Sequence, residues 1–429
     1  MTISQPGRRP LGLVAAIALV MGNMIGSGVF LLPAALAPYG WNAVAGWILT
    51  IAGALALAHV IAQLTRALPN ASGPIAMVDT AFGPIVGFAI GWSYWVSIWT
   101  ANVTIAIAAV SYLSLFVPLI GKTQGLAALS AFLLLWGLTL INLRGARAAG
   151  GFQVTTLLLK LVPLVVVLVL ILVVLGHHGT AALAPFPSSG LSATGITASA
   201  ALTLWALLGF ESASAAADKV AEPARDIPRA TMIGTLATGL IYLLVCSGIA
   251  LMLPPELAAH SDAPFADFVA RYGTGGAAHL IGLFAAISAI GALNGWILLQ
   301  GEIPLAMARA GRLPAWMGVT DERGTPVRAI LLSSLMASLL LAANSLRAIA
   351  DIFTFMALLS TAATLWLYLA CAAAALKLRV TIPFASIGLL YALWTLWGAG
   401  LDTSGLSLAL MLAGFPLYWW TRTAVRRPI

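Results

Sequence analysis

Two charged side chains lie within long apolar segments, where a charge is costly and is a functional candidate by default. Glu211 stands in one apolar segment, beside Gly209 and two serines. Lys160 stands in another, several residues from its nearer end at Gly151. We expect both side chains to face the protein interior. There a carboxylate and an ammonium can bind a charged solute or couple a proton to its movement.

Glycines interrupt two of the apolar segments. Residues 22–30 hold three glycines and Ser27, and such a stretch either lets helices pack closely or unwinds. The second interruption, at Gly209, favours unwinding, because paired interruptions in two halves of a transporter are typical of a midplane binding site. We therefore predict helix breaks at Gly26 and Gly209. Free N–H groups at the Gly26 break would hold a carboxylate, and free carbonyls at the Gly209 break would hold an ammonium. Such a site suits a zwitterion.

The elements that must position these residues are membrane helices. Of 429 residues, 61% are hydrophobic and 8% charged, which is too little charge for the surface of a soluble domain. The apolar segments lack the period-two alternation of a transmembrane barrel. The sequence therefore predicts an all-α membrane protein with twelve transmembrane helices. Their expected limits are 11–37, 42–65, 84–116, 125–142, 153–176, 196–217, 231–253, 276–307, 328–344, 350–376, 381–400 and 405–421.

These helices are expected to form one transporter domain over residues 1–429. Its two halves of five helices would occupy 11–176 and 196–376, and two further helices 381–421. The interrupted helices are the first and the sixth, so each begins one half. The repeat is inferred from this placement.

The distribution of basic residues predicts the orientation. With a cytoplasmic N-terminus, 17 of the 21 lysines and arginines fall in cytoplasmic segments, and only Lys122, Arg271 and Arg347 in outer ones. Both termini are therefore expected in the cytoplasm and the protein in the bacterial inner membrane. The net charge of +8 then reflects topology and the lipid bilayer, and not a nucleic-acid partner.

Few other residues suggest chemistry. Asp79 and Glu302 lie near cytoplasmic ends and are expected to be solvated or paired there. Cys246 and Cys371 lie in apolar blocks, and no residues have metal-ligand spacing or an ATP-binding pattern, so we expect no metal and no cofactor. An enzyme would need a cluster of catalytic groups, and a channel symmetric rings of charge or carbonyls. A carrier is the remaining class.

Three motifs carry a resemblance to a known family. They are residues 22–33 (GNMIGSGVFLLP), 204–212 (LWALLGFES) and 222–230 (EPARDIPRA). The chain resembles the amino acid–polyamine–organocation transporters over nearly its whole length, and most closely the basic amino acid and polyamine antiporters, including those for arginine and agmatine. This resemblance implies a five-plus-five inverted repeat (LeuT-like), discontinuous first and sixth helices, an amino acid or amine substrate and, by analogy, a homodimer.

The resemblance also implies roles for individual residues. Ser27 and Gly28 would hold the substrate carboxylate, and the backbone carbonyls of Trp205 and Leu208 its ammonium. Trp296 would cover the substrate as the near gate and Trp205 would be the outer gate. Three further residues, Ser97, Asn102 and Ser360, would line the pocket for the substrate side chain. The inner gate would consist of Tyr94, Glu211 and Tyr368.

The chain departs from the arginine/agmatine antiporters at two places, and these differences leave open both the substrate and the ion that drives transport. Ile98 and Ile105 stand where arginine/agmatine antiporters have cysteine and methionine. Lys160 stands where they have a small apolar residue, and in other members of the superfamily a lysine here resembles a substitute for a sodium ion. The two candidate functions are an antiporter that exchanges a basic amino acid for its decarboxylated amine, and a proton-coupled amino acid symporter.

Overall fold

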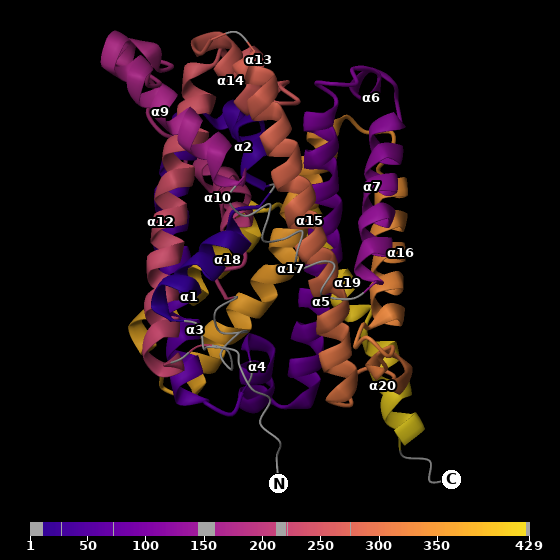
Figure 1. Cartoon of the computed structure of the whole chain (residues 1–429). Helices are drawn as coiled ribbons and strands as arrows, with labels where there is room; N and C mark the ends of the chain where they lie inside the picture. The colour runs from indigo at the N-terminus through magenta and orange to yellow at the C-terminus, as the bar shows by residue number, and fades with distance from the viewer. Residues whose placement is uncertain are drawn as a thin grey trace.

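The computed structural model describes residues 12–26, 28–71, 73–144, 159–211, 220, 222–274 and 276–425, and helices dominate it (Figure 1). The first group is α1 (Leu13–Met24), α2 (Gly28–Leu36), α3 (Trp41–Ala67), α4 (Pro74–Phe82), α5 (Pro84–Leu113), α6 (Leu119–Lys122), α7 (Leu126–Asn142) and α9 (Leu161–His178). The second group is α10 (Ala193–Leu207), α12 (Pro223–Met252), α13 (Pro255–Ala259), α14 (Pro264–Tyr272), α15 (Ala277–Arg309), α16 (Val327–Ala343), α17 (Ile349–Lys377), α18 (Ile382–Gly398), α19 (Leu401–Leu412) and α20 (Phe415–Val425).

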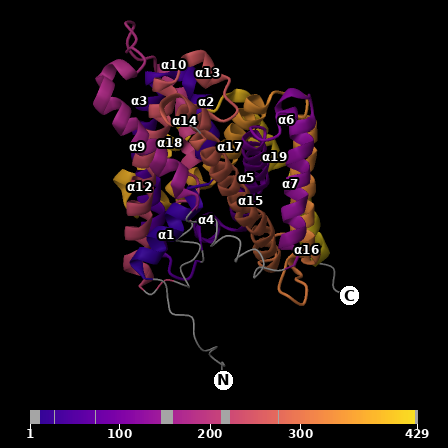
Figure 2. The same ribbon diagram turned by 45° about the horizontal axis from the view of Figure 1, so that its top comes forward.

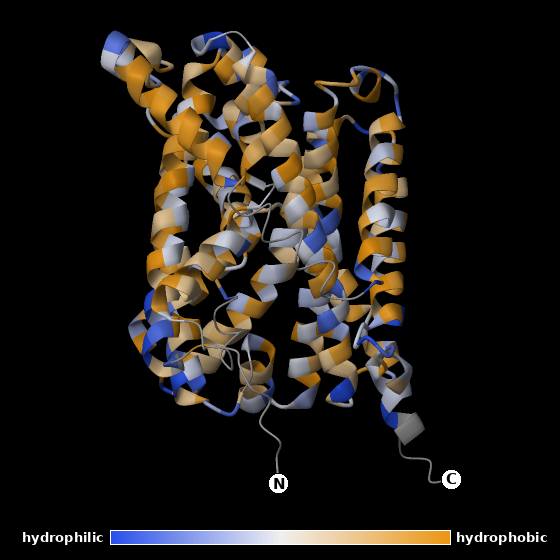
Figure 3. Cartoon of the chain, in the orientation of Figure 1, coloured by the Kyte–Doolittle hydropathy of each residue, from blue (hydrophilic) through white to orange (hydrophobic). Residues whose placement is uncertain are grey.

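The composition of the helices is that of a membrane protein. Seven helices of the described residues are long and apolar enough to cross a bilayer, and α1 with α2 makes an eighth span that is bent by 51°. Four shorter apolar helices, α7, α10, α16 and α18, accompany them. Together they overlap the twelve predicted spans, and the prediction of an all-helical membrane protein is confirmed. Figure 3 shows apolar helix sides, with many of the most hydrophilic residues near the two ends.

Helices α5 and α15 form the centre of the bundle. They have 30 and 33 residues and pack against each other, and α17 packs against α5 (Figure 2). Almost every residue of α5 between Gly87 and Tyr112 is buried, so its polar side chains face protein and not lipid. Peripheral helices such as α9 instead expose apolar residues, for example Val165 and Leu172.

Among the described α-helices, the short α4, α6, α13 and α14 lie outside the predicted spans. Helices α4, α13 and α14 each begin at a proline, whose fixed φ suits the first helical residue. They have nine, five and nine residues, and a search for membrane-length apolar segments passes over helices of that size.

Helices α4 and α14 have matching positions at opposite ends of the bundle. Each has nine residues, and each precedes one of the two central helices, α5 or α15. In Figure 1, α4 lies at the end where α1 begins and α20 ends, whereas α14 lies at the other end with α6. Two halves of opposite orientation would have this arrangement.

The orientation can be tested by labelling single cysteines in intact cells. Arg8→Cys and Arg426→Cys should resist a membrane-impermeant thiol reagent, because basic residues favour the cytoplasmic side. Lys122→Cys, at the exposed end of α6, should be labelled. The native Cys246 and Cys371 are buried and should contribute little background. Labelling of either terminus from outside would overturn the orientation.

Candidate functional site

The first span is interrupted after Met24, where the end of α1 leaves carbonyls that its own helix cannot satisfy. The Met24 carbonyl accepts hydrogen bonds from the Tyr242 hydroxyl at 3.0 Å and from the Gly26 N–H at 2.8 Å. The Gly22 carbonyl accepts one from Lys160 Nζ at 3.3 Å. Side chains from two other parts of the chain thus replace missing helical bonds.

A second helix end meets the first. Helix α10 ends at Leu207, and Gly209 follows with a φ of +107°, a conformation that favours glycine. A Cβ at Gly209 would lie 3.4 Å from the Asn23 backbone. Glycine therefore allows both the turn and its close approach to the end of α1. Residues 212–219, beyond this turn, lie outside the described residues.

Glu211 lies at the junction of these helix ends and is 4% exposed. Tyr94 of α5 donates its hydroxyl to Oε1 at 2.8 Å, and Tyr368 of α17 donates to Oε2 at 2.8 Å. The Gly209 N–H donates to Oε2 at 3.2 Å. The Tyr368 ring also stacks on Phe210, with ring centres 4.7 Å apart. One carboxylate therefore joins α5, α17 and the turn after α10, and the structure brings the three predicted inner-gate residues together.

Lys160 directly precedes α9 and is 1% exposed. Its bond to the Gly22 carbonyl sets a positive charge at the carbonyl end of α1, which is the negative pole of that half-helix. The side chain therefore faces inward, as expected.

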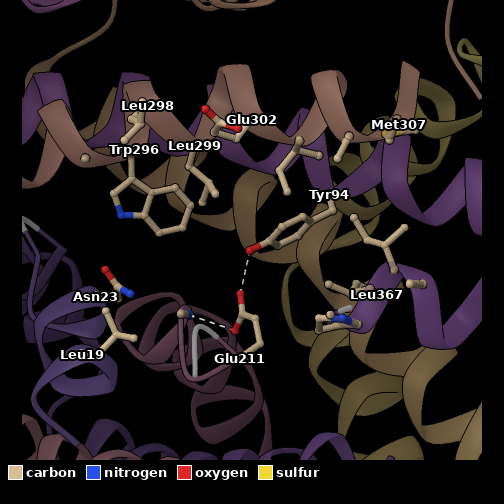
Figure 4. Close-up of a pocket in the computed structure, with 18 of the residues that line it drawn as sticks. Leu19, Asn23, Tyr94, Glu211, Trp296, Leu298, Leu299, Glu302, Met307 and Leu367 are labelled. Carbon is tan, nitrogen blue, oxygen red and sulfur yellow. Dashed lines mark hydrogen bonds between the residues drawn. The ribbon is translucent and has the colours of Figure 1, made fainter. Parts of the chain in front are cut away.

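A cavity of about 790 Å³ begins at this junction. Glu211, Lys160, Asn23 and Trp296 line its inner part, and Figure 4 shows the Trp296 indole across the cavity from Asn23. The lining continues along α4 and α15 to the surface at the end of the bundle where α1 begins.

The lining carries charges of both signs. The carboxylates are Asp79, Glu211 and Glu302, and the two cations are Lys160 and Arg312.

An ion pair stands at the outer rim of the cavity. Arg312 Nη2 lies 2.9 and 2.7 Å from the two carboxylate oxygens of Asp79. Asp79 is therefore paired, which is one of the two alternatives expected for it, but its partner was not predicted. The two residues are 233 positions apart, and only the fold brings α4 next to the segment after α15.

The remaining predicted pocket residues lie outside the cavity lining. Ser97 donates its hydroxyl to the Tyr94 carbonyl, and Ser360 donates to the Ser97 carbonyl. Asn102 donates its amide to Gln300 at 2.6 Å. All three predicted residues are buried, and in this conformation the two hydroxyls and the Asn102 amide nitrogen bond to protein, whereas the buried Asn102 Oδ1 has no hydrogen-bond partner among the described residues.

Trp205 packs against Gly28 at the start of α2. A Cβ on Gly28 would lie 2.1 Å from the Trp205 ring, so only a glycine admits this indole. Trp205 also meets Phe353 edge to face, with ring centres 5.3 Å apart. Its own carbonyl accepts the Leu208 N–H at 3.3 Å. Ser27, the other predicted carboxylate ligand, lies outside the described residues.

Residues 11–418 match the amino acid permease family. The chain belongs to that family. It is therefore a multi-pass transporter and not an enzyme. The cadaverine/lysine antiporter of Escherichia coli strain K12 is 34% identical over 330 residues, which cover 76% of this chain and 73% of that protein.

Two further relatives match more of the chain. The arginine/ornithine antiporter of Pseudomonas aeruginosa is 31% identical over 461 residues, covering 100% of this chain and 94% of that protein. A putrescine transporter of Haemophilus influenzae is 30% identical over 421 residues, which cover 95% of this chain and 96% of that protein. These relatives place the chain in the basic amino acid and polyamine antiporter branch of the family.

Replacing the central carboxylate tests its part in proton coupling. Glu211→Gln keeps the size and an acceptor for a tyrosine hydroxyl but removes the titration. We expect it to fold and to bind substrate, with slower transport and a flatter dependence of rate on pH. Transport against pH in liposomes, together with a melting curve, measures both effects. A variant with the parent's full pH dependence would remove Glu211 from the coupling, and a large loss of stability would indicate a structural carboxylate.

Proposed function

We propose that this protein is an antiporter that exchanges a cationic amino acid for a related amine by alternating access. The observation that carries the proposal is the buried Glu211, held by Tyr94 and Tyr368 where the ends of α1 and α10 meet and at the head of a cavity that Asp79 and Glu302 also line. A carboxylate at this depth can bind a proton or attract a cationic substrate. The relatives' names pair lysine with cadaverine and arginine with ornithine, and arginine with agmatine is a further candidate pair.

Alternating access requires the site at Glu211 to be open toward one side of the membrane and closed toward the other. We propose that the described conformation faces the cytoplasm, because the cavity reaches the surface at the end with α4. On the other side of the junction Trp205 packs on Gly28 and closes the route. In the opposite, outward-facing conformation, a bound substrate would separate Trp205 from Gly28.

The binding roles proposed from the resemblance fit this scheme. The substrate carboxylate would be held by Ser27 and Gly28 at the start of α2, and the ammonium by the carbonyls of Trp205 and Leu208. Trp296 would cover the side chain and Asn102, Ser97 and Ser360 would contact it once Trp205 withdraws. In the described conformation Trp205 instead occupies the space beside Gly28, which supports its role as a gate.

We also propose the twelve-helix topology with inverted halves at 11–176 and 196–376 and cytoplasmic termini. Its support is the matched placement of α4 and α14 at opposite ends and of α5 and α15 at the centre. The two additional helices, at 381–421, correspond to α18, α19 and part of α20.

A proton-coupled symporter is the second candidate, and Lys160 favours it. Its ammonium lies against the end of α1, where a fixed positive charge can replace a coupling cation.

Exchange in proteoliposomes separates the two candidates. We expect uptake of labelled lysine or arginine to saturate and to require an internal counter-substrate, either an amine such as cadaverine or putrescine or the amino acid ornithine. Liposomes without internal substrate but with an imposed pH gradient are the control. Equal uptake into these liposomes would favour the symporter, and uptake without saturation or counterflow would contradict a carrier.

Trp296 is expected to contribute to substrate affinity. A cation over an indole contributes about 0.5–2 kcal/mol, so Trp296→Ala should weaken substrate binding several-fold to about thirtyfold. Trp296→Tyr should retain part of the affinity, because a phenol ring also attracts a cation. Binding titration of the purified protein measures both variants. Unchanged affinity in the alanine variant would make Trp296 a packing residue.

Transport is expected to need no sodium, because the Lys160 ammonium occupies the place of a coupling cation beside α1. Lys160→Ala should lose transport or change its dependence on pH, and Lys160→Met, which keeps more of the side-chain volume, should do the same. Melting curves of both variants check folding. Strong stimulation of the parent protein by sodium would contradict the role of Lys160.

A further inference from the structure

A second, smaller cavity lies at the end of the molecule opposite to α4. It has a volume of about 240 Å³ and is lined by the connection from α6 to α7 and the connection from α16 to α17. Gln124 of the first connection donates its amide to the Leu346 carbonyl of the second at 3.4 Å. The cavity is therefore a junction of two loops that are far apart in the sequence and belong to the outer face under the proposed orientation.

Two cationic side chains line this cavity, Lys122 and Arg347. They are two of the three basic residues that the charge distribution assigns to the outer face. Arg347 lies over the Phe355 ring, 4.8 Å from its centre, which holds the guanidinium beside α17. Neither side chain forms a salt bridge within the part of the chain that the structure describes.

Two helix N-termini also reach the cavity. Ala127 and Ala128 are the second and third residues of the 17-residue α7, and Ile349 begins the 29-residue α17. First-turn N–H groups lack helical acceptors and carry the positive pole of the helix. Two cations and two positive helix ends therefore converge on one site, which is the arrangement that binds phosphate and similar anions.

Two carboxylates lie near the site but do not line the cavity. Asp351 lies in the first turn of α17. Asp262 approaches Gly121, and burial together with the neighbouring Asp267 raises the pKa of Asp262.

The surroundings of the cavity are apolar. Leu119, which begins α6, and Leu346, which precedes Arg347, are 62% and 75% exposed, and Leu129 of α7 is 52% exposed. Exposed leucines beside a cationic site at the end of a membrane bundle suit acyl chains beneath a charged headgroup.

We infer that the cavity lined by Lys122 and Arg347 binds a phosphate-type anion, and that the headgroup of an anionic phospholipid is its source. The bound headgroup would hold the α6–α7 connection to the α16–α17 connection.

Thermal stability with added lipid tests this site. Purified full-length protein in detergent is titrated with phosphatidylglycerol, with phosphatidylcholine and with inorganic phosphate, and the melting temperature is recorded. We expect phosphatidylglycerol to raise the melting temperature more than phosphatidylcholine. Lys122→Gln and Arg347→Gln should each weaken the phosphatidylglycerol effect about tenfold in concentration, because each removes a charge-assisted contact.

Arg271→Gln is the matched control. Arg271 is also an exposed basic residue of the proposed outer face, but it stacks on Tyr272 and does not line the cavity. It should keep the parent's response. An equal loss in Arg271→Gln and in the two cavity variants, or a parent that does not distinguish the two lipids and ignores phosphate, would overturn the site. Stabilisation by phosphate alone would keep the site and assign its source to the free anion. Lys122→Gln, at an exposed position, keeps the test valid if Arg347→Gln fails to fold.

Discussion

A carboxylate at membrane depth is costly unless hydrogen-bond donors surround it, because the bilayer offers none. Glu211 finds three of them, from Tyr94, Tyr368 and the Gly209 N–H. This requirement ties α5 and α17 to the turn after α10. It also explains why a glycine with positive φ stands two residues before the carboxylate, since the turn must direct an N–H group at its own side chain.

The same requirement governs the end of α1. Its carbonyls would face an apolar environment without partners, and the side chains of Lys160 and Tyr242 supply them. The two helix ends touch at Gly209 and Asn23, so the groups that satisfy them are brought to one place. The binding site that we propose at this junction would use the same groups, because a substrate could exchange places with these internal partners.

Much of this arrangement was predictable. Span positions follow from apolar length, and the breaks from glycines in the middle of apolar segments, since both depend on local composition. Glu211 and Lys160 were identifiable because an ionisable residue in such a segment is rare. Helix α4 was not predictable from hydropathy, and neither was the pairing of Asp79 with Arg312, which depends on contacts across 233 positions.

The sequence by itself determined the membrane environment, the helical class, the interrupted first span and the two buried charges. Each depends on the free energy of placing a local segment in lipid, which neighbours in the sequence largely decide. Only the tertiary structure decided which groups satisfy those charges and where the cavity runs. Ser97 and Ser360 illustrate the difference: their hydroxyls bond to carbonyls of α5, and Trp205 occupies the space beside Gly28. Whether such residues face substrate or protein depends on how whole helices pack in one conformation, and that packing is a property of segments distant in the sequence.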